Sequence, residues 1–195
     1  PPPPRSAPPP PPTPPSPPSP PSPPSPPPPS PYSPNELLRR ALKVCLQKSS
    51  SGACMCDYES PCDSYTGGDM SSYDTSEVTE MIELFKDSSF NFDISSWDVS
   101  NVTSMYRMFR SAGSFNKPLT AWNVSRVTNF KEMFYSANNF NEDVSGWNTA
   151  SATDMSYMFY GARYFNKPIG SWDVSSVTSM SSMFSNNYGS SQFNQ

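Results

Sequence analysis

The sequence predicts an α/β solenoid, in which about five coils of 25 residues stack lengthwise behind an N-terminal capping helix. The first observation is a set of three columns that keep a step of 25 residues. They are Trp97, Trp122, Trp147 and Trp172; Phe109, Phe134, Phe159 and Phe184; and Met108, Met133, Met158 and Met183. The second is that 23 of the 26 prolines fall in residues 1–34, which hold almost nothing apolar to bury. We therefore expect a proline-rich spacer over 1–33, a capping helix and cysteine-rich loop over 34–69, and a repeat array over 70–195 that is cut short at its C-terminal end.

The proline-rich head is expected to be a semi-rigid, extended spacer. Proline fixes φ near −65° and keeps its predecessor extended, so the head should be disordered or polyproline II. Serines recur at steps of three, at Ser16, Ser19, Ser22 and Ser25. This Ser-Pro-Pro pattern resembles the hydroxyproline-rich glycoproteins of plant and algal walls, such as extensins and pherophorins. The alternatives are an unmodified linker and a ligand for the grooves of SH3, WW or profilin-type domains.

A helix is predicted over roughly residues 34–47. Ser33-Pro34-Asn35-Glu36 is a capping box with proline at the first helical position. Apolar residues then fall on one face at helical spacing. They are Leu37, Leu38, Ala41, Leu42, Cys45 and Leu46. We expect this face to cover the open end of the repeat array.

All four cysteines lie close together, at Cys45, Cys54, Cys56 and Cys62. The spacing lacks the paired C-x-x-C knuckles of a zinc site and any redox C-x-x-C. The favoured interpretation is two disulfides formed in an oxidising compartment, with four free thiols as the alternative. A bond between Cys54 and Cys56 would be strained, and the other two pairings stay open.

Each coil is predicted to be a short strand followed by a turn or two of helix. In the unit that begins at Phe115, Leu119, Trp122 and Val124 match the L-x-x-L-x-L spacing of leucine-rich repeats, whose last two residues flank a strand. The second half of the unit has apolar residues at steps of three and four, which describe one face of a helix. They are Val127, Phe130, Met133, Phe134 and Ala137. The Trp, Met and Phe columns should form one continuous core along the stack.

The composition excludes several classes of function. The chain has no histidine, which removes Ser-His-Asp and Cys-His nucleophile systems and histidine metal sites. A net charge of −4 gives no basic footprint for nucleic acid. No apolar run approaches the ~18 residues that span a bilayer. Acidic residues are scattered rather than paired at a fixed column, so we expect no enzymatic activity. We also expect no cofactor, no metal and a monomeric array.

The best candidate for a ligand surface is the polar residue that follows each Trp. This column consists of Asp98, Asn123, Asn148 and Asp173. A serine follows two residues later in three of the four copies, which is typical of an Asx turn. The alternative is a polar stripe on the exposed face of the strand, where a protein or glycan could bind.

Three further sets of polar residues belong to the repeat. The Asn column is expected to bond neighbouring coils with inward amides rather than to bind a ligand, and it consists of Asn91, Asn116, Asn141 and Asn166. Asn101-Val-Thr and Asn123-Val-Ser are candidate N-glycosylation sequons, although both follow the repeat pattern. Positions that vary between copies are expected on a solvated convex face. They are Tyr106, Arg107, Arg110, Lys131, Glu132, Tyr135 and Tyr157.

The repeat motif resembles one family of surface proteins. Residues 96–109, SWDVSNVTSMYRMF, followed by Ala112 and Phe115-Asn116, are similar to the leucine-rich repeats of BspA-like proteins. The resemblance implies a secreted or cell-surface location, with adhesion or protein binding as the role and no catalytic residues. We therefore predict an extracellular surface or cell-wall protein that binds protein or glycan. The alternative is an intracellular repeat scaffold whose proline-rich head binds SH3, WW or profilin-type domains.

Overall fold

The computed structural model describes residues 32–48 and 70–185, apart from the side chains of residues 44–48. The chain divides into two compact units, Pro1–Pro31 and Tyr32–Gln195, and the described residues all belong to the second. Two helices occur in this part, α1 over Pro34–Lys48 and a single 3-10 turn, η1, over Met70–Ser72. The predictions for the proline-rich head, for the cysteine side chains and for the array beyond residue 185 fall outside the described residues.

Helix α1 begins where the capping box predicts. The Ser33 carbonyl accepts the N–H groups of Glu36 and Leu37 at 3.0 and 2.9 Å, and the Ser33 hydroxyl also accepts the Glu36 N–H at 3.3 Å. On the apolar face of the helix, Leu38 and Leu42 are buried in the same core as the repeats. The helix expected over residues 34–47 is therefore present, and its apolar face packs against the array.

Asn35 of α1 closes the first edge of the stack. A threonine recurs at one position of the coils, at Thr79, Thr103, Thr128, Thr153 and Thr178. From the second coil on, its backbone N–H donates to the threonine carbonyl of the preceding coil, as Thr103 does to Thr79 at 2.8 Å. Thr79 belongs to the first coil, and the Asn35 Oδ1 accepts its N–H at 2.9 Å and that of Glu80 at 3.3 Å. An exposed edge of unpaired backbone groups invites aggregation, and a single oxygen of α1, Asn35 Oδ1, satisfies two of them.

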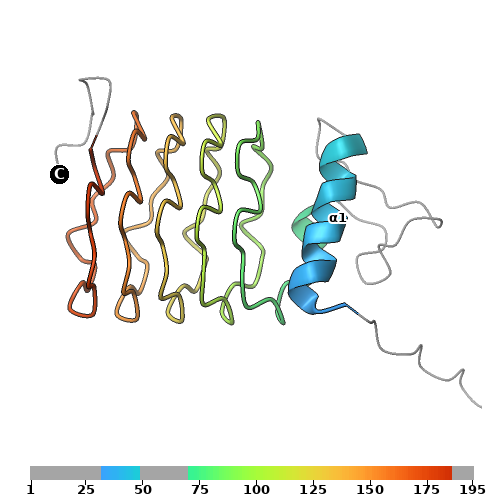
Figure 1. Ribbon diagram of the computed structural model, residues 1–195, viewed down its shortest axis with the longest axis horizontal. Helices are drawn as coiled ribbons and strands as arrows, with labels where there is room; N and C mark the ends of the chain where they lie inside the picture. Colours follow the sequence, from blue (N-terminus) through green and yellow to red (C-terminus); the bar gives the residue numbers. More distant parts are fainter. Residues whose placement is uncertain (1–31, 49–69, 186–195) are drawn as a thin grey trace, which may run out of the picture. The chain divides into compact units, whose positions relative to one another are not determined.

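The repeats form parallel coils that lie side by side, as Figure 1 shows. Isolated parallel bridges join consecutive coils at the same position in each repeat. The bridged pairs are Glu80 with Ser104, Ser104 with Asn129, Asn129 with Asp154, and Asp154 with Ser179. The neighbouring threonine column continues the contact, since Thr128, Thr153 and Thr178 each donate a backbone N–H to the preceding threonine at 2.8–2.9 Å.

The prediction of an α/β solenoid with a strand and a helix in every coil is wrong. Between residues 105 and 111, the N–H groups of Arg107 and Phe109 donate to carbonyls of the next coil at 3.1 and 2.9 Å. Those of Met108 and Arg110 donate three residues back within their own coil, at 3.1 Å each. An α-helix needs bonds to the residue four positions back, so this half is a run of turns.

Left-handed residues prevent a helix from forming in the repeats. Arg107 and Ser111 have φ of 55° and 56°, and equivalent residues in the other coils are also left-handed. Two such residues in each of the first four turn-rich halves, and Ser182 in the fifth, interrupt the right-handed helical path. The turns nevertheless bury residues at three-residue steps, so the apolar pattern resembles that of a helix.

The other half of the coil contains no named strand within residues 70–185. The Trp122 N–H donates to the Leu119 carbonyl at 3.1 Å and the Val127 N–H donates to the Val124 carbonyl at 2.9 Å, which are local turns. Trp122 and Val124 are buried and Asn123 is exposed, so the side chains alternate as expected. Alternation over three residues is too short to distinguish a strand from two successive turns.

The repeated aromatic columns form the core along the stack. The four indoles are buried, with 2–7% of their surface exposed. Rings of the Phe column lie 5.5 Å apart from Phe109 to Phe134 and from Phe134 to Phe159, with nearly parallel planes. The indole N–H of Trp122 donates to the Ile94 carbonyl of the preceding coil at 3.1 Å, and Trp147 and Trp172 repeat this bond at 3.1 and 3.0 Å. Each Trp therefore fills the core of its own coil and fastens it to the previous one.

The Asn column also joins neighbouring coils, but from the surface rather than from inside. The Asn116 N–H donates to the Asn91 Oδ1, and the Asn116 Oδ1 accepts the Asn141 N–H, both at 2.9 Å. Asn91 and Asn116 are exposed, and Asn141 and Asn166 are half-buried, so none of the four is buried in the core. The expected inter-coil bonds are present, whereas the expected inward orientation is wrong.

Replacing one member of this column should cost little stability. We expect Asn116→Ala to lower the free energy of unfolding by about 1 kcal/mol, because one inter-coil hydrogen bond is lost at a position where water replaces it. Urea unfolding followed by circular dichroism measures the change, and Thr120→Ala serves as an exposed control on the same coil. Equal effects of the two substitutions would mean that the Asn column does not hold the coils together.

Candidate functional site

The four residues that follow the Trp column are all exposed. Each uses a side-chain oxygen to accept the backbone N–H two residues later. The distances are 2.9 Å from Ser100 to Asp98, 3.2 Å from Ser125 to Asn123, 3.2 Å from Ala150 to Asn148 and 2.9 Å from Ser175 to Asp173. The column therefore makes Asx turns, and whether it also binds a ligand stays a prediction.

These turns lower the pKa of the carboxyl groups in the column. The Ser100 side chain, followed by its backbone N–H, lowers the pKa of Asp98, while partial burial and the charge of Asp74 act in the opposite direction. The Ser175 side chain and backbone N–H likewise lower the pKa of Asp173. The carboxylates are thus held in the ionised form that accepts the turn bonds.

The array should lose stability in acid through these turns. A folded-state pKa below the unfolded value of about 3.9 gives stability that is present above that pH and is lost as pH falls through the folded pKa. We expect Asp98→Asn with Asp173→Asn to reduce the acid-induced loss with little change at neutral pH, because Asn123 and Asn148 make the same turn. Thermal unfolding from about pH 7 to about pH 2 measures this. Equal losses in the double variant and the natural protein would contradict it.

The two sequons differ in their surroundings. The Asn101 Nδ2 donates to the Ser76 carbonyl at 2.8 Å, and its Oδ1 accepts from Arg126 at 2.8 Å, so the whole amide is engaged in inter-coil bonds. Asn123 is exposed and uses only its Oδ1, in the turn with Ser125, among the bonds described. N-glycosylation of either residue remains a prediction.

Three further predictions concern the cysteines, metal binding and membrane-spanning helices. Of the four cysteines, only the backbone of Cys45 is described, as part of α1, so the disulfides remain predictions. No group of three potential metal ligands occurs within the described residues. In the same residues, no helix combines the length and hydropathy that crossing a bilayer requires.

A cluster of arginines and tyrosines on the turn-rich side of the coils is the most organised polar feature. Its centre is Glu132, which is only 7% exposed. The Glu132 carboxylate accepts from Arg107 through Nε at 3.0 Å and Nη2 at 3.2 Å, and also from Nη1 of Arg110. Arg107 additionally bonds Glu83 of the preceding coil at 3.3 Å. One buried carboxylate thus fixes two guanidinium groups of the neighbouring coil.

Each of these guanidinium groups lies over a tyrosine ring. Arg107 lies 4.6 Å from the ring centre of Tyr106, and Arg110 lies 4.5 Å from that of Tyr135. The Tyr135 ring stacks on Tyr160 of the next coil at 4.7 Å with an interplanar angle of 12°. Tyr157 lies against Tyr160 at 5.7 Å. We call this set the Arg–Tyr surface; it consists of Tyr106, Arg107, Arg110, Glu132, Tyr135, Tyr157 and Tyr160.

The Arg–Tyr surface was not predicted from the sequence, where these positions are expected to be separate solvated residues. Glu132, expected in water, is buried, and the tyrosines are half-buried. The sequence signal for this surface is the same step of 25 residues that reveals the core. Arg107 and Glu132 have opposite charge at that step, and Arg110, Tyr135 and Tyr160 share another column.

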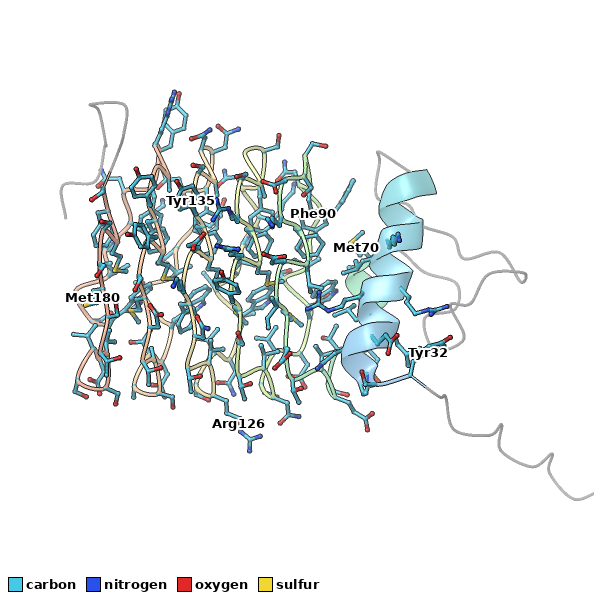
Figure 2. All side chains as sticks on the ribbon, in the orientation of Figure 1. Tyr32, Met70, Phe90, Arg126, Tyr135 and Met180 are labelled. Carbon is cyan, nitrogen blue, oxygen red and sulfur yellow. The ribbon has the colours of Figure 1, made fainter. Side chains whose placement is uncertain are left out.

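The Arg–Tyr surface has the chemistry of a binding site. Tyrosine and arginine are enriched in the residues that dominate protein interfaces. Its rings and guanidinium groups are already held by stacking and by Glu132, which reduces the entropy lost on binding. Figure 2 shows Tyr135 in the upper half of the stack and Arg126 projecting from the row of turns at the lower edge, so Arg126 can serve as a control.

Comparison with known proteins identifies a family for most of the chain. A family model described as "Mycoplasma protein of unknown function, DUF285" matches residues 58–163 and 119–195. The two matches overlap and together cover well over half of the 195 residues. No curated protein matches the chain. No solved structure matches it.

Proposed function

The chain belongs to the DUF285 family, and from this premise we propose that it is a non-enzymatic surface protein that binds protein or glycan through the Arg–Tyr surface. The family match is consistent with the resemblance to BspA-like surface repeats, which implies an adhesive role outside the cell. The clustered cysteines and the wall-type Ser-Pro-Pro head support the same location.

The observation that carries the proposal is the fixation of Arg107 and Arg110 by the buried Glu132 carboxylate. Two charged contacts at one carboxylate hold both guanidinium groups over tyrosine rings, so these side chains are ordered before any partner binds. Coils are already joined by backbone bonds and by the Trp column. The additional cluster is therefore best explained as a preformed contact surface.

Location and adhesion can be tested separately. Intact cells of the source organism are treated with a membrane-impermeant amine reagent, and peptides containing Lys117 and Lys167 are followed by mass spectrometry. We expect both lysines to be labelled while a cytosolic marker is not. Labelling only after lysis would support the intracellular scaffold instead.

Adhesion is measured with beads that carry the purified full chain. We expect the beads to attach to the same cells, and attachment to fall at least fivefold when Tyr157→Ala and Tyr160→Ala are combined. Arg126→Ala is the matched control at the opposite edge of the coils. Equal attachment of the double variant, with unchanged thermal unfolding, would contradict a role for the Arg–Tyr surface.

A further inference from the structure

We propose that the Arg–Tyr surface binds a polyproline II strand of the Ser-Pro-Pro type, supplied by the proline-rich head of a second copy of the chain. The inference rests on the proposed function and names its partner. It connects the two parts of the sequence that stand apart from the repeat core, the head and the Arg–Tyr surface. The result would be copies linked head to array.

The chemistry of the head matches what this surface offers. Residues 14–30 contain only proline and serine, so they present prolyl rings and many carbonyl acceptors but few N–H donors. Polyproline II segments dock on aromatic side chains, which contact the prolines while polar donors bind the free carbonyls. Tyr135, Tyr157 and Tyr160 provide ring edges, Tyr135 and Tyr157 provide hydroxyl groups, and Arg107 and Arg110 provide guanidinium N–H groups beyond those that bond Glu132 and Glu83.

The repeat along the stack of coils and the repeat of a polyproline II helix have matching lengths. Tyr135 and Tyr160 occupy equivalent positions in adjacent coils, and their rings lie 4.7 Å apart. Strands joined by backbone hydrogen bonds lie about 4.8 Å apart, so two bonded coils advance about 9.6 Å. One polyproline II turn of three residues advances about 9.3 Å. A head lying along the stack would thus present the same edge of each Ser-Pro-Pro triplet to every second coil.

Two pairs of residues are placed to use this match. Arg107 and Tyr157 are 50 residues apart, as are Arg110 and Tyr160, so each pair occupies equivalent positions two coils apart. Successive turns of the strand would meet the two arginines on one coil and the Tyr157–Tyr160 pair two coils further along. Serine at every third position, from Ser16 to Ser25, keeps the edge constant over the strand.

Charge favours a neutral partner. Glu132 and Glu83 pair with both arginines of the surface and with Lys86, so three cations meet two carboxylates and only a small positive charge remains. Residues 14–30 carry no charge and meet no repulsion from a chain with a net charge of −4. Every copy of the chain supplies this segment, and a second copy is therefore the partner that the sequence itself provides.

A synthetic peptide with the sequence of residues 14–30 tests the proposal. The fluorescent peptide is titrated with the full chain, and its anisotropy is recorded. We expect saturable binding that weakens at least tenfold when Tyr157→Ala and Tyr160→Ala are combined, and less than twofold with Arg126→Ala. A peptide of equal length with glycine in place of every proline should not bind. Thermal unfolding verifies that the variants fold. If the double alanine variant does not fold, Tyr157→Phe combined with Tyr160→Phe is used instead, because it retains the rings.

Sedimentation of the full chain provides the second measurement. We expect self-association that increases with concentration and is reversed by excess peptide. Absence of peptide binding, or equal binding by the folded double variant, would overturn the inference. If the beads still attach to cells through the Arg–Tyr surface while the peptide does not bind, only the partner is wrong. If both fail, the proposed function falls as well.

Discussion

Trp122→Ala should lower the free energy of unfolding by about 3–5 kcal/mol. The indole is 4% exposed and lies in the middle of the stack, so the substitution leaves a large cavity. It also removes the N–H that donates to the Ile94 carbonyl of the preceding coil at 3.1 Å, so this carbonyl keeps only its bond from the Trp97 N–H. Urea unfolding followed by tryptophan fluorescence measures the loss, because three indoles remain in the chain.

Trp122→Phe separates the two contributions. Phenylalanine fills much of the cavity but cannot donate, so we expect a smaller loss of about 2 kcal/mol. A loss below about 1 kcal/mol for the alanine variant would mean that the site is solvated. The indole would then not be part of a continuous core.

Glu132→Gln should lower the free energy of unfolding by about 2–3 kcal/mol. Breaking a buried ion pair from one side costs about 3–5 kcal/mol when the remaining charge has no access to water. The cost here should be smaller, because the side chains of Arg107 and Arg110 are 29% and 27% exposed and can recover some hydration. Urea unfolding of the variant against the natural protein measures the difference.

The same variant should weaken binding beyond its effect on stability. Without the carboxylate, Arg107 and Arg110 lose the contacts that hold them over Tyr106 and Tyr135, and bead attachment should fall under conditions where the variant is fully folded. Glu77→Gln is the control, since Glu77 is exposed. If Glu132→Gln and Glu77→Gln change stability equally, Glu132 is not the centre of the cluster.

The repeat columns predicted the core because side-chain burial depends on the identity of the residue. Trp122, Phe134 and their equivalents are apolar at a constant step, and they are buried wherever the structure describes them well inside the stack. The start of the capping helix could also be predicted from the sequence, because the Ser33-Pro34-Asn35-Glu36 signal depends on local chemistry alone. The sequence did not reveal that Asn35 would cap the backbone of Thr79.

The conformation of each coil could not be predicted in the same way. Successive turns and a helix both bury residues at steps of three and four, so the pattern from Val127 to Ala137 fits either. The difference lies in backbone φ angles at Arg107, Ser111 and their equivalents, of which only Gly161 is a glycine, the residue that adopts the left-handed region most readily. Hydrogen bonds between coils select that conformation, and they are absent from any one repeat considered alone.

The Arg–Tyr surface escaped prediction for a related reason. Its residues are ordinary surface types, and only their positions on neighbouring coils bring them together. Arg107 and Glu132 are 25 residues apart in sequence but bonded in space. Applying the repeat step to charges and aromatic rings, as well as to the core, would have predicted these pairs.

The central claim is that one half of each coil is a run of turns rather than a helix, in which alternate N–H groups bond carbonyls of the next coil. Hydrogen-bond scalar couplings measured by NMR test it most directly, because they identify the donor and acceptor of each bond. The structure predicts a coupling between the Phe109 amide nitrogen and the Met133 carbonyl carbon, whose atoms bond at 2.9 Å. A coupling from Phe109 to the Met105 carbonyl instead would show an α-helix and contradict the account.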